Sequence, residues 1–306
     1  MQPLTTHLYT ETGYLTPTPP FDFARSLEFL GSFAPMQGEQ TIAARLLTKA
    51  TYVEGQIIGF QLTSTGTVDA PKLEYTLFSE QPISDAVKHT AVDRVSFFLS
   101  LDDDLRPFYQ IGLDDPDFAP VIQELYGYHH VKFLTPFESA CWAVLAQRNP
   151  RSIAQRMKQA LAKTYGGRIN VQGTTYQAFP EAAQLIDVSE NELLTVVRNA
   201  RKAEYLVAVI KAFHEVDEEF LRTGNYDEVE AWLRKIKGFG EWSASFVLLR
   251  GLRRMEQAPL SEKVLLEAAS RQYGSGRDLT RSEVAKFAER YGAYKGYWAH
   301  YLRVAS

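Results

Sequence analysis

The feature of this sequence that most constrains its fold is a turn between two helical patterns, in the stretch VEAWLRKIKGFGEWSASFVLLRGL. Leu233 and Ile236 are the last apolar positions of the helical pattern before the turn. Ala244, Val247 and Leu248 are the first apolar positions of the pattern after it. The two glycines between them allow a tight turn with positive φ and a close approach of the backbone to another surface. The stretch therefore predicts a helical hairpin.

A helix that begins directly after such a turn offers free backbone N–H groups and the positive end of its dipole. Together they can bind a phosphate without a side-chain charge, and such contacts position a nucleic acid independently of its base sequence. An ordinary helix corner with a glycine cap is the alternative, and the full apolar pattern favours the phosphate site. The residues that we expect to contact the strand are Lys237, Gly238, Phe239, Gly240 and Glu241.

The chain divides into two parts with different patterns. In the front part, ARLLTKATYVEGQIIGFQLTST, KLEYTLFS and RVSFFLSL predict strands, with a turn at Glu54-Gly55, and FDFARSLEFLGSF predicts a short helix that ends at Gly31. From Thr135 onward the patterns are helical, beginning with a capping box formed by Thr135 and Glu138. We expect an α+β domain built on an antiparallel sheet over residues 1–112, followed by an all-α domain over residues 113–306.

Charge is distributed unevenly along the 306 residues, although the net charge is only −4. The part from Val131 onward has 26 Lys and Arg against 20 Asp and Glu, whereas the part before it has 7 against 17. Such an asymmetry can hide a basic face for DNA inside an acidic total. A solvated charge pattern without any partner is an equal alternative.

Cysteine content and hydropathy exclude several other classes of protein. The single cysteine, Cys141, excludes an internal disulfide and a four-cysteine iron–sulfur cluster, and its apolar neighbours predict a core position. No run of about 18 apolar residues predicts a membrane span. The polar start of the chain lacks the layout of a signal peptide. We expect a monomeric protein of the cytoplasm, associated with the nucleoid if bacterial, without membrane contact.

Several stretches, taken in order, resemble the helix-hairpin-helix (HhH-GPD) DNA glycosylase superfamily, and within it the alkylation-repair or 3-methyladenine branch. They are FDFARSLEFLGSF, PFESACWAVLAQRNPRSIAQRM, RKAEYL, IKGFGEWSASFVLLRG and SEVAKFAERYGAYKGYWAHY. The resemblance implies a base excision repair enzyme that flips an alkylated or otherwise damaged base out of double-stranded DNA and cuts its bond to the sugar. The hairpin departs from the family at Lys237, where proline is usual. A lysine still allows the turn, and it adds a cation beside the phosphate site.

The resemblance places the catalytic carboxylate at Glu262, 12 residues beyond Arg250, where the family has an aspartate. A carboxylate beside C1′ stabilises the positive charge that develops on the sugar, and it can orient the attacking water. The extra methylene moves the carboxylate by roughly 1.5 Å, and a misplacement of about 1 Å can cost around a hundredfold in rate. Two alternatives therefore stay open. One is a catalytically weak or inactive protein that binds damaged DNA, and the other is a Glu262 that serves only the dipole of a helix capped by Ser261.

A flipped base needs aromatic faces to stack on. Trp242 and Phe246 are four residues apart, on one helix face, and the resemblance places both in the base pocket. A plain hydrophobic core is the alternative. By the same resemblance Arg303 takes the position at which the best-known branch stacks a tryptophan, and Trp298 or Tyr301 could substitute after a shift of the helix. A cation there would repel a cationic base, which favours neutral lesions such as deaminated purines.

The resemblance also implies a wedge that fills the gap left by the flipped nucleotide. Arg148 falls on the wedging residue and Gln147 lies beside it, with an exposed loop arginine as the alternative. Glycosylases with lyase activity use a lysine two residues beyond the second hairpin glycine, where this chain has Trp242. We therefore expect a monofunctional enzyme.

The 6 histidines show no metal-ligand spacing, so we expect no catalytic metal. The only cofactor considered is a monovalent cation, which the resemblance allows at the hairpin carbonyls. The expected partner is double-stranded DNA that contains damaged bases. A third interpretation gives the chain no DNA role, with the hairpin as a mere helix corner and the acidic front part as a protein-interaction surface.

Overall fold

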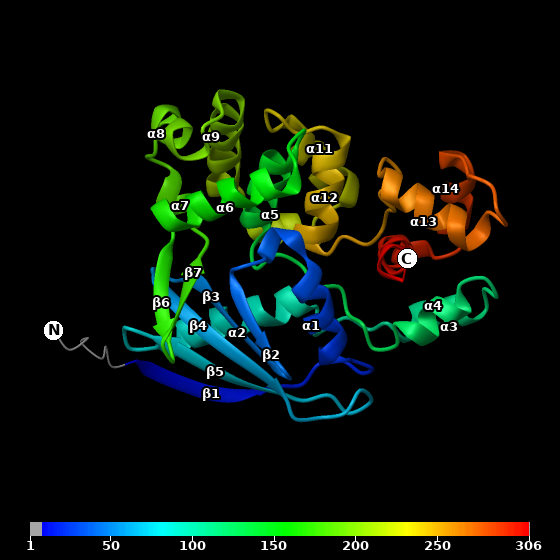
Figure 1. The fold of residues 1–306 in the computed structure, drawn as a ribbon, viewed down its shortest axis with the longest axis horizontal. Coiled ribbons are helices and arrows are strands. Elements are labelled where there is room, and N and C mark those ends of the chain that lie inside the picture. Colours follow the sequence, from blue (N-terminus) through cyan, green and yellow to red (C-terminus); the bar gives the residue numbers. More distant parts are fainter. Residues whose placement is uncertain (1–7, 306) are drawn as a thin grey trace.

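A five-stranded antiparallel sheet forms the front part of the chain in a computed structural model, which describes residues 8–305 (Figure 1). In spatial order its strands are β1 (Tyr9–Leu15), β5 (Leu73–Ser79), β4 (Gln56–Ser64), β3 (Leu46–Val53) and β2 (Gln40–Ala43). Glu54 and Gly55 join β3 to β4 with φ angles of 47° and 81°, as a two-residue hairpin turn requires. The prediction of β3, β4 and β5 from alternating residues is therefore confirmed.

Two parts of the front domain differ from the prediction. RVSFFLSL is not a strand, because residues 94–99 form the end of helix α2 (Asp85–Leu99) and Ser100 is its C-cap. The N-cap Ser84 accepts a hydrogen bond from Val87 N–H at 3.3 Å. A short apolar run can belong to a buried helix or to a buried strand, so its pattern alone does not decide between them. Strands β1 and β2 were not predicted. Residues 1–7 of the polar start lie outside the described residues.

A two-stranded ribbon, also not predicted, connects the helical part back to the sheet. It consists of β6 (Gly167–Val171) and β7 (Thr174–Ala178), and it leaves the helices to cross β3 and β4 (Figure 1). Ile169 and Val171 pack with Phe78 in a small hydrophobic cluster of their own. A Cβ at Gly59 would lie 2.9 Å from the Val171 side chain, so the glycine permits this close approach.

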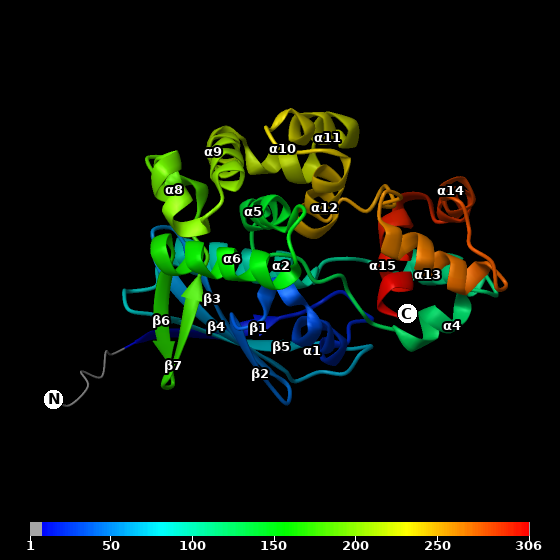
Figure 2. The same cartoon turned by 45° about the horizontal axis from the view of Figure 1, so that its top comes forward.

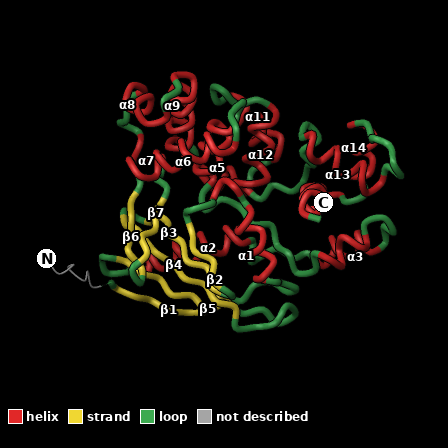
Figure 3. The backbone as a smooth tube through the Cα atoms, viewed as in Figure 1, coloured by secondary structure: helices red, strands yellow, loops and turns green. Residues whose placement is uncertain are grey.

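Helices make up the rest of the chain and lie above and beside the sheet (Figures 2 and 3). Apart from α2, they are α1 (Phe23–Ser32), α3 (Arg106–Leu113), α4 (Ala119–Glu124), α5 (Pro136–Ala146), α6 (Arg151–Tyr165), α7 (Ala182–Leu185), α8 (Glu190–Val197), α9 (Ala200–Glu215), α10 (Glu218–Thr223), α11 (Tyr226–Lys235), α12 (Glu241–Leu252), α13 (Lys263–Tyr273), α14 (Arg281–Glu289) and α15 (Lys295–Val304). No helix among the described residues has the length and apolar character needed to cross a membrane.

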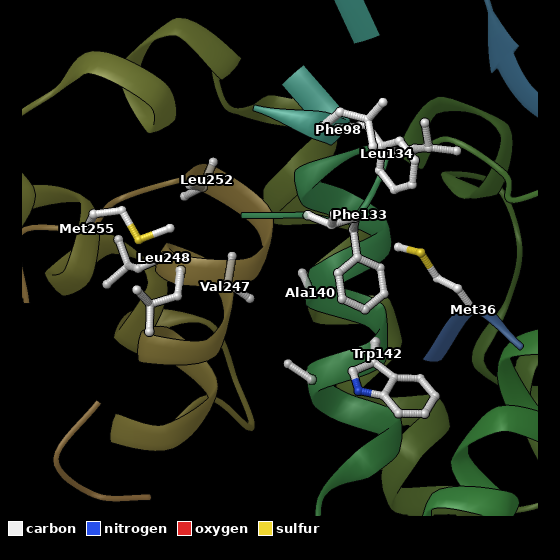
Figure 4. Packing of buried hydrophobic residues seen from close by; sticks show 14 of the residues in the cluster. Met36, Phe98, Phe133, Leu134, Ala140, Trp142, Val247, Leu248, Leu252 and Met255 are labelled. Atoms are coloured by element: carbon white, nitrogen blue, oxygen red, sulfur yellow. The ribbon is translucent and has the colours of Figure 1, made fainter. Parts of the chain in front are cut away.

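Helix α5 is the centre of the helical part, and its residues 136–145 are all buried. It packs against α12, where Val247 faces Ala140 (Figure 4). Thr135 caps α5 as predicted, because its hydroxyl accepts from Glu138 N–H at 3.1 Å. The second half of the predicted capping box does not form, since the Glu138 carboxylate pairs with the buried Lys158 at 2.6 Å.

The domain boundary predicted after residue 112 falls inside α3. The side chains of this helix pack against α15: the ring centroids of Phe108 and Tyr301 are 5.0 Å apart, and the Tyr109 and Tyr301 hydroxyls are 3.1 Å apart. Helix α3 therefore packs as a whole with the C-terminal helices, and one hydrophobic core runs from the sheet into them.

Candidate active site

The hairpin predicted from the glycine turn lies between α11 and α12. Gly238 has a φ of 91°, and a Cβ at this position would lie 2.4 Å from the ring of Tyr205. Both facts require glycine here. The Phe239 side chain is buried, and its N–H donates to Ile236 O at 3.0 Å, which closes the turn.

The start of α12 leaves backbone N–H groups without a capping side chain. The N-cap is Gly240, which has no side chain to cap the helix, and the first intrahelical hydrogen bond runs from Ala244 N–H to Gly240 O at 3.0 Å. The N–H groups of residues 241–243 precede that bond and lack intrahelical partners one turn back. Because Gly240 and Glu241 are exposed, the turn is open to a phosphate.

Both charges beside the turn are already paired on the surface. Lys237 Nζ lies 2.6 Å from a Glu204 carboxylate oxygen, and Arg281 of α14 lies 2.6 Å from Glu241. Exposed pairs of this kind are worth only about 0–1 kcal/mol. Arg281, which the sequence analysis did not identify, offsets the negative charge that Glu241 would otherwise present to a phosphate.

The loop between α5 and α6, predicted as the wedge, lies against the hairpin. Gln147 Nε2 donates to Gly238 O and to Ser243 Oγ, both at 2.8 Å. Arg148 follows with a φ of 54° and an exposed side chain. The structure thus brings the two predicted DNA-contacting segments together on one surface.

A pocket of about 560 Å³ lies between α1, α5, α12, α15 and the start of α13. Trp242 and Phe246 line it as the sequence predicts, with their ring centroids 5.3 Å apart. Phe29 of α1, Phe33 at the C-cap of α1 and Trp142 of α5 also line it, and the sequence analysis did not identify these three. The pocket therefore has aromatic rings from three helices.

Glu262 directs its carboxylate into this pocket from the N-cap position of α13. The side chain makes no capping hydrogen bond to its own helix; its Oε2 accepts instead from Arg303 Nη1 at 2.7 Å. The Glu262 side chain is 11% exposed and that of Arg303 is 25% exposed. The alternative was that Ser261 caps this helix and that Glu262 only interacts with the helix dipole. It is not supported, because the N-cap is Glu262 itself and its side chain makes no hydrogen bond to the helix.

A buried guanidinium underlies the same pocket. Arg250 donates from Nη1 to His130 Nε2 at 3.0 Å and from Nη2 to His300 Nδ1 at 3.2 Å. Burial, and then the neighbouring charge of Arg303, lower the pKa of Arg250 to about 10. Burial also holds the pKa of both imidazoles well below the ordinary value, so they are neutral acceptors. With Arg151 and Lys263, which also line the pocket, Arg250 and Arg303 surround the single carboxylate of Glu262 with positive charge.

Two residues predicted for the base pocket do not reach it. Trp298 and Tyr301 are completely buried. Trp298 Nε1 donates to the Tyr273 hydroxyl at 3.0 Å, and the Tyr301 hydroxyl donates to Tyr128 O at 2.6 Å. They are three residues apart, so they share the inward face of α15, whereas Arg303 lies on another face and lines the pocket. The substitution of Arg303 by either aromatic residue is therefore not supported.

No group of three or more metal-ligating side chains occurs within residues 8–305. At the hairpin, Ile236 O accepts from Phe239 N–H and Gly238 O accepts from Gln147. A carbonyl oxygen has two lone pairs, so each oxygen keeps one with which it could bind a monovalent cation. Such a cation stays a prediction.

Comparison with known proteins confirms the fold class. No protein-family model matches the chain. Its sequence is similar to that of the DNA-3-methyladenine glycosylase of Bacillus subtilis (strain 168), with 26% identity over 228 residues that cover 74% of this chain and 75% of that protein. Its fold is similar to the 3-methyladenine DNA-glycosylase from Archaeoglobus fulgidus, with a TM-score of 0.78, 18% identity and coverage of 95% and 97%. It is also similar to MBOgg1 in complex with a low affinity DNA ligand, with a TM-score of 0.71, 16% identity and coverage of 97% of both chains.

Proposed function

We propose that the chain is a member of the helix-hairpin-helix DNA glycosylase superfamily, in its 3-methyladenine branch, and that its residues act in base excision repair as follows. The hairpin binds the strand, a damaged base enters the 560 Å³ pocket, and Glu262 assists hydrolysis of its bond to the sugar. The substrate is double-stranded DNA with an alkylated or otherwise damaged base.

The observation that carries this proposal is that one helix, α12, contributes both to the phosphate site at the hairpin and to the lining of the pocket. The first amides of α12 have no capping side chain and follow the exposed Gly240, while Trp242, Phe246 and Arg250 of the same helix line the pocket. Glu262 faces them across it. A strand held at the hairpin would therefore place a flipped nucleotide within reach of a rigidly positioned carboxylate.

The reaction requires only the Glu262 carboxylate and a water molecule. As the N-glycosidic bond breaks, its electron pair leaves with the base, and the ionised carboxylate of Glu262 stabilises the cationic sugar. A water oxygen then bonds to C1′ and loses a proton to solvent. A cationic base leaves as a neutral molecule, whereas a neutral base leaves as an anion and takes up a proton from solvent. Lys263 lines the rim of the pocket, but its side chain is 88% exposed and paired with Glu267 at 3.1 Å, so we do not assign it as a nucleophile. We therefore propose excision without lyase chemistry.

The test is excision from duplexes that carry one alkylated or deaminated base, assayed with wild type and Glu262→Gln. Wild type should leave an abasic site, so the strand breaks only after alkali, and Glu262→Gln should leave the base in place. Release by the Gln variant at the wild-type rate would contradict the role of the carboxylate. Salt-sensitive duplex binding without release of any base would instead support the binding protein considered above.

A further inference from the structure

A buried lysine lies directly behind the loop that carries Arg148. Lys202 of α9 is 5% exposed, and its Nζ donates to Val144 O at 2.6 Å and to Gln147 O at 2.8 Å. Among the described residues no carboxylate lies within ion-pair distance of it. Lysine is almost never buried without such a partner, so this position needs an explanation.

The two acceptors are carbonyls at the end of α5. The last carbonyls of a helix have no intrahelical partner and carry the negative end of its dipole, which attracts a cation. The Gln147 carbonyl belongs to the peptide bond that leads into Arg148. Lys202 therefore bonds the peptide immediately before the wedging residue.

From that peptide the contacts continue to the hairpin. The Gln147 side chain donates to Gly238 O and Ser243 Oγ, both at 2.8 Å. Lys202, the loop and the hairpin thus form one continuous hydrogen-bonded path. Arg148 has a φ of 54°, a conformation that costs a non-glycine residue about 1–3 kcal/mol and persists only when its surroundings fix it.

We propose that Lys202 is a positioning residue for the wedge, fixing the peptide before Arg148 against the hairpin so that strand binding and wedge insertion occur as one rigid movement. This inference rests on the proposed function. The charged form of Lys202 is destabilised in the folded protein. Burial, and then the neighbouring cations Arg148 and Arg201, lower the pKa of Lys202 to about 8. A residue that only filled space would not need an ammonium group there.

The experiment compares Lys202→Met with wild type on two substrates that carry the same lesion. In one, the lesion faces a normal base in a duplex. In the other, it lies in a short unpaired bubble, where no gap in the stack must be filled. We expect Lys202→Met to slow excision roughly tenfold or more on the duplex and by less than about threefold on the bubble. Lys202→Arg, which can donate to both carbonyls, should restore most of the duplex rate.

Lys211→Met is the matched control, because Lys211 is an exposed lysine on the same helix. It should leave both rates unchanged. An equal loss on both substrates would show a general structural defect and overturn the positioning role. Full duplex activity of Lys202→Met would overturn it too.

A second readout does not depend on excision. 2-Aminopurine placed beside the lesion becomes more fluorescent when the stack opens, and Lys202→Met should reduce this rise on binding. If wild type opens the stack but releases no base, the proposed hydrolysis fails while the positioning role is still tested. If the fluorescence rise is the same in wild type and Lys202→Met, the positioning role fails.

Discussion

Glu262 and Arg303 face each other in the pocket, with Oε2 and Nη1 2.7 Å apart. One residue is the N-cap of α13 and the other lies in the last turn of α15. The arginine therefore fixes where the glutamate carboxylate points, a task that the glutamate's own helix does not perform. This explains how a side chain one methylene longer than the aspartate that the resemblance implies can be held in one place.

Removing the carboxylate charge should abolish the chemical step and leave DNA binding intact. We expect Glu262→Gln to lower the single-turnover excision rate by roughly 10²–10³ or more, the scale of a lost electrostatic group at a reacting centre. Glu262→Asp should keep the charge but lose the reach to Arg303, with a fall of roughly tenfold. Excision by Glu262→Asp faster than wild type would mean that Arg303 does not fix the working position.

Arg303 should influence which lesion is removed. Its positive charge lies next to the base and pairs with Glu262. Replacing it with glutamine removes that charge and leaves the Glu262 carboxylate unneutralised, so binding of a cationic base becomes more favourable. We expect Arg303→Gln to shift the ratio of kcat/KM for 7-methylguanine over hypoxanthine upward, by roughly tenfold, an energy of about 1.4 kcal/mol. The control is Arg271→Gln, which removes an exposed cation on α13 outside the pocket lining. An unchanged ratio would show that Arg303 does not determine which lesion the site prefers.

Residues close together in sequence were the part of the site that could be predicted. The hairpin, Trp242 and Phe246 belong to one continuous stretch, so helical spacing alone places them on common faces. Glu262 came from spacing within a family resemblance. The structure places it in the same pocket as the two aromatic residues.

What the sequence did not reveal depends on contacts between distant segments. Phe29 and Phe33 reach the pocket because α1 lies between the sheet and the C-terminal helices (Figure 2). Lys202 is unremarkable in a helical pattern, and only the fold places it at the end of α5. Trp298 and Tyr301 were expected to replace Arg303 after a shift of the helix, but both point into the core, and only Arg303, the residue at the position that the resemblance gave, lines the pocket.

The two hairpin glycines should respond differently to alanine. Gly238→Ala must adopt a φ of 91° with its Cβ 2.4 Å from the Tyr205 ring, whereas a Cβ at Gly240 meets nothing within 4 Å. We expect Gly238→Ala to lower the free energy of unfolding by about 1–3 kcal/mol, and Gly240→Ala to change it little. Gly240→Ala should still weaken duplex binding, because its methyl group occupies the space that a phosphate needs. Denaturant unfolding and a salt titration of binding separate the two effects, and equal stability of both variants would contradict the geometry.

The ammonium of Lys202 should make wedge function sensitive to pH. With a pKa of about 8, it loses its charge as pH rises through that value, while Arg148 and Arg201, the charged groups that face it, remain protonated. We therefore expect the duplex excision rate to fall above about pH 8 in wild type. In Lys202→Arg it should stay flat over the same range.

As pH rises through this range, the contribution of Lys202 to the free energy of unfolding should increase while the excision rate falls. A loss of wedge function can therefore be distinguished from a loss of stability. The ordinary pKa of lysine is 10.5, so between about 8 and 10.5 the unfolded chain binds more protons at this position than the folded one. The contribution of Lys202 to the free energy of unfolding therefore rises with pH in that window, and unfolding at this site cannot explain a falling rate. Thermal melts of wild type and Lys202→Arg beside their pH–rate profiles provide the measurement. A wild-type profile that matches that of Lys202→Arg would show that the charge on this lysine does not govern the wedge.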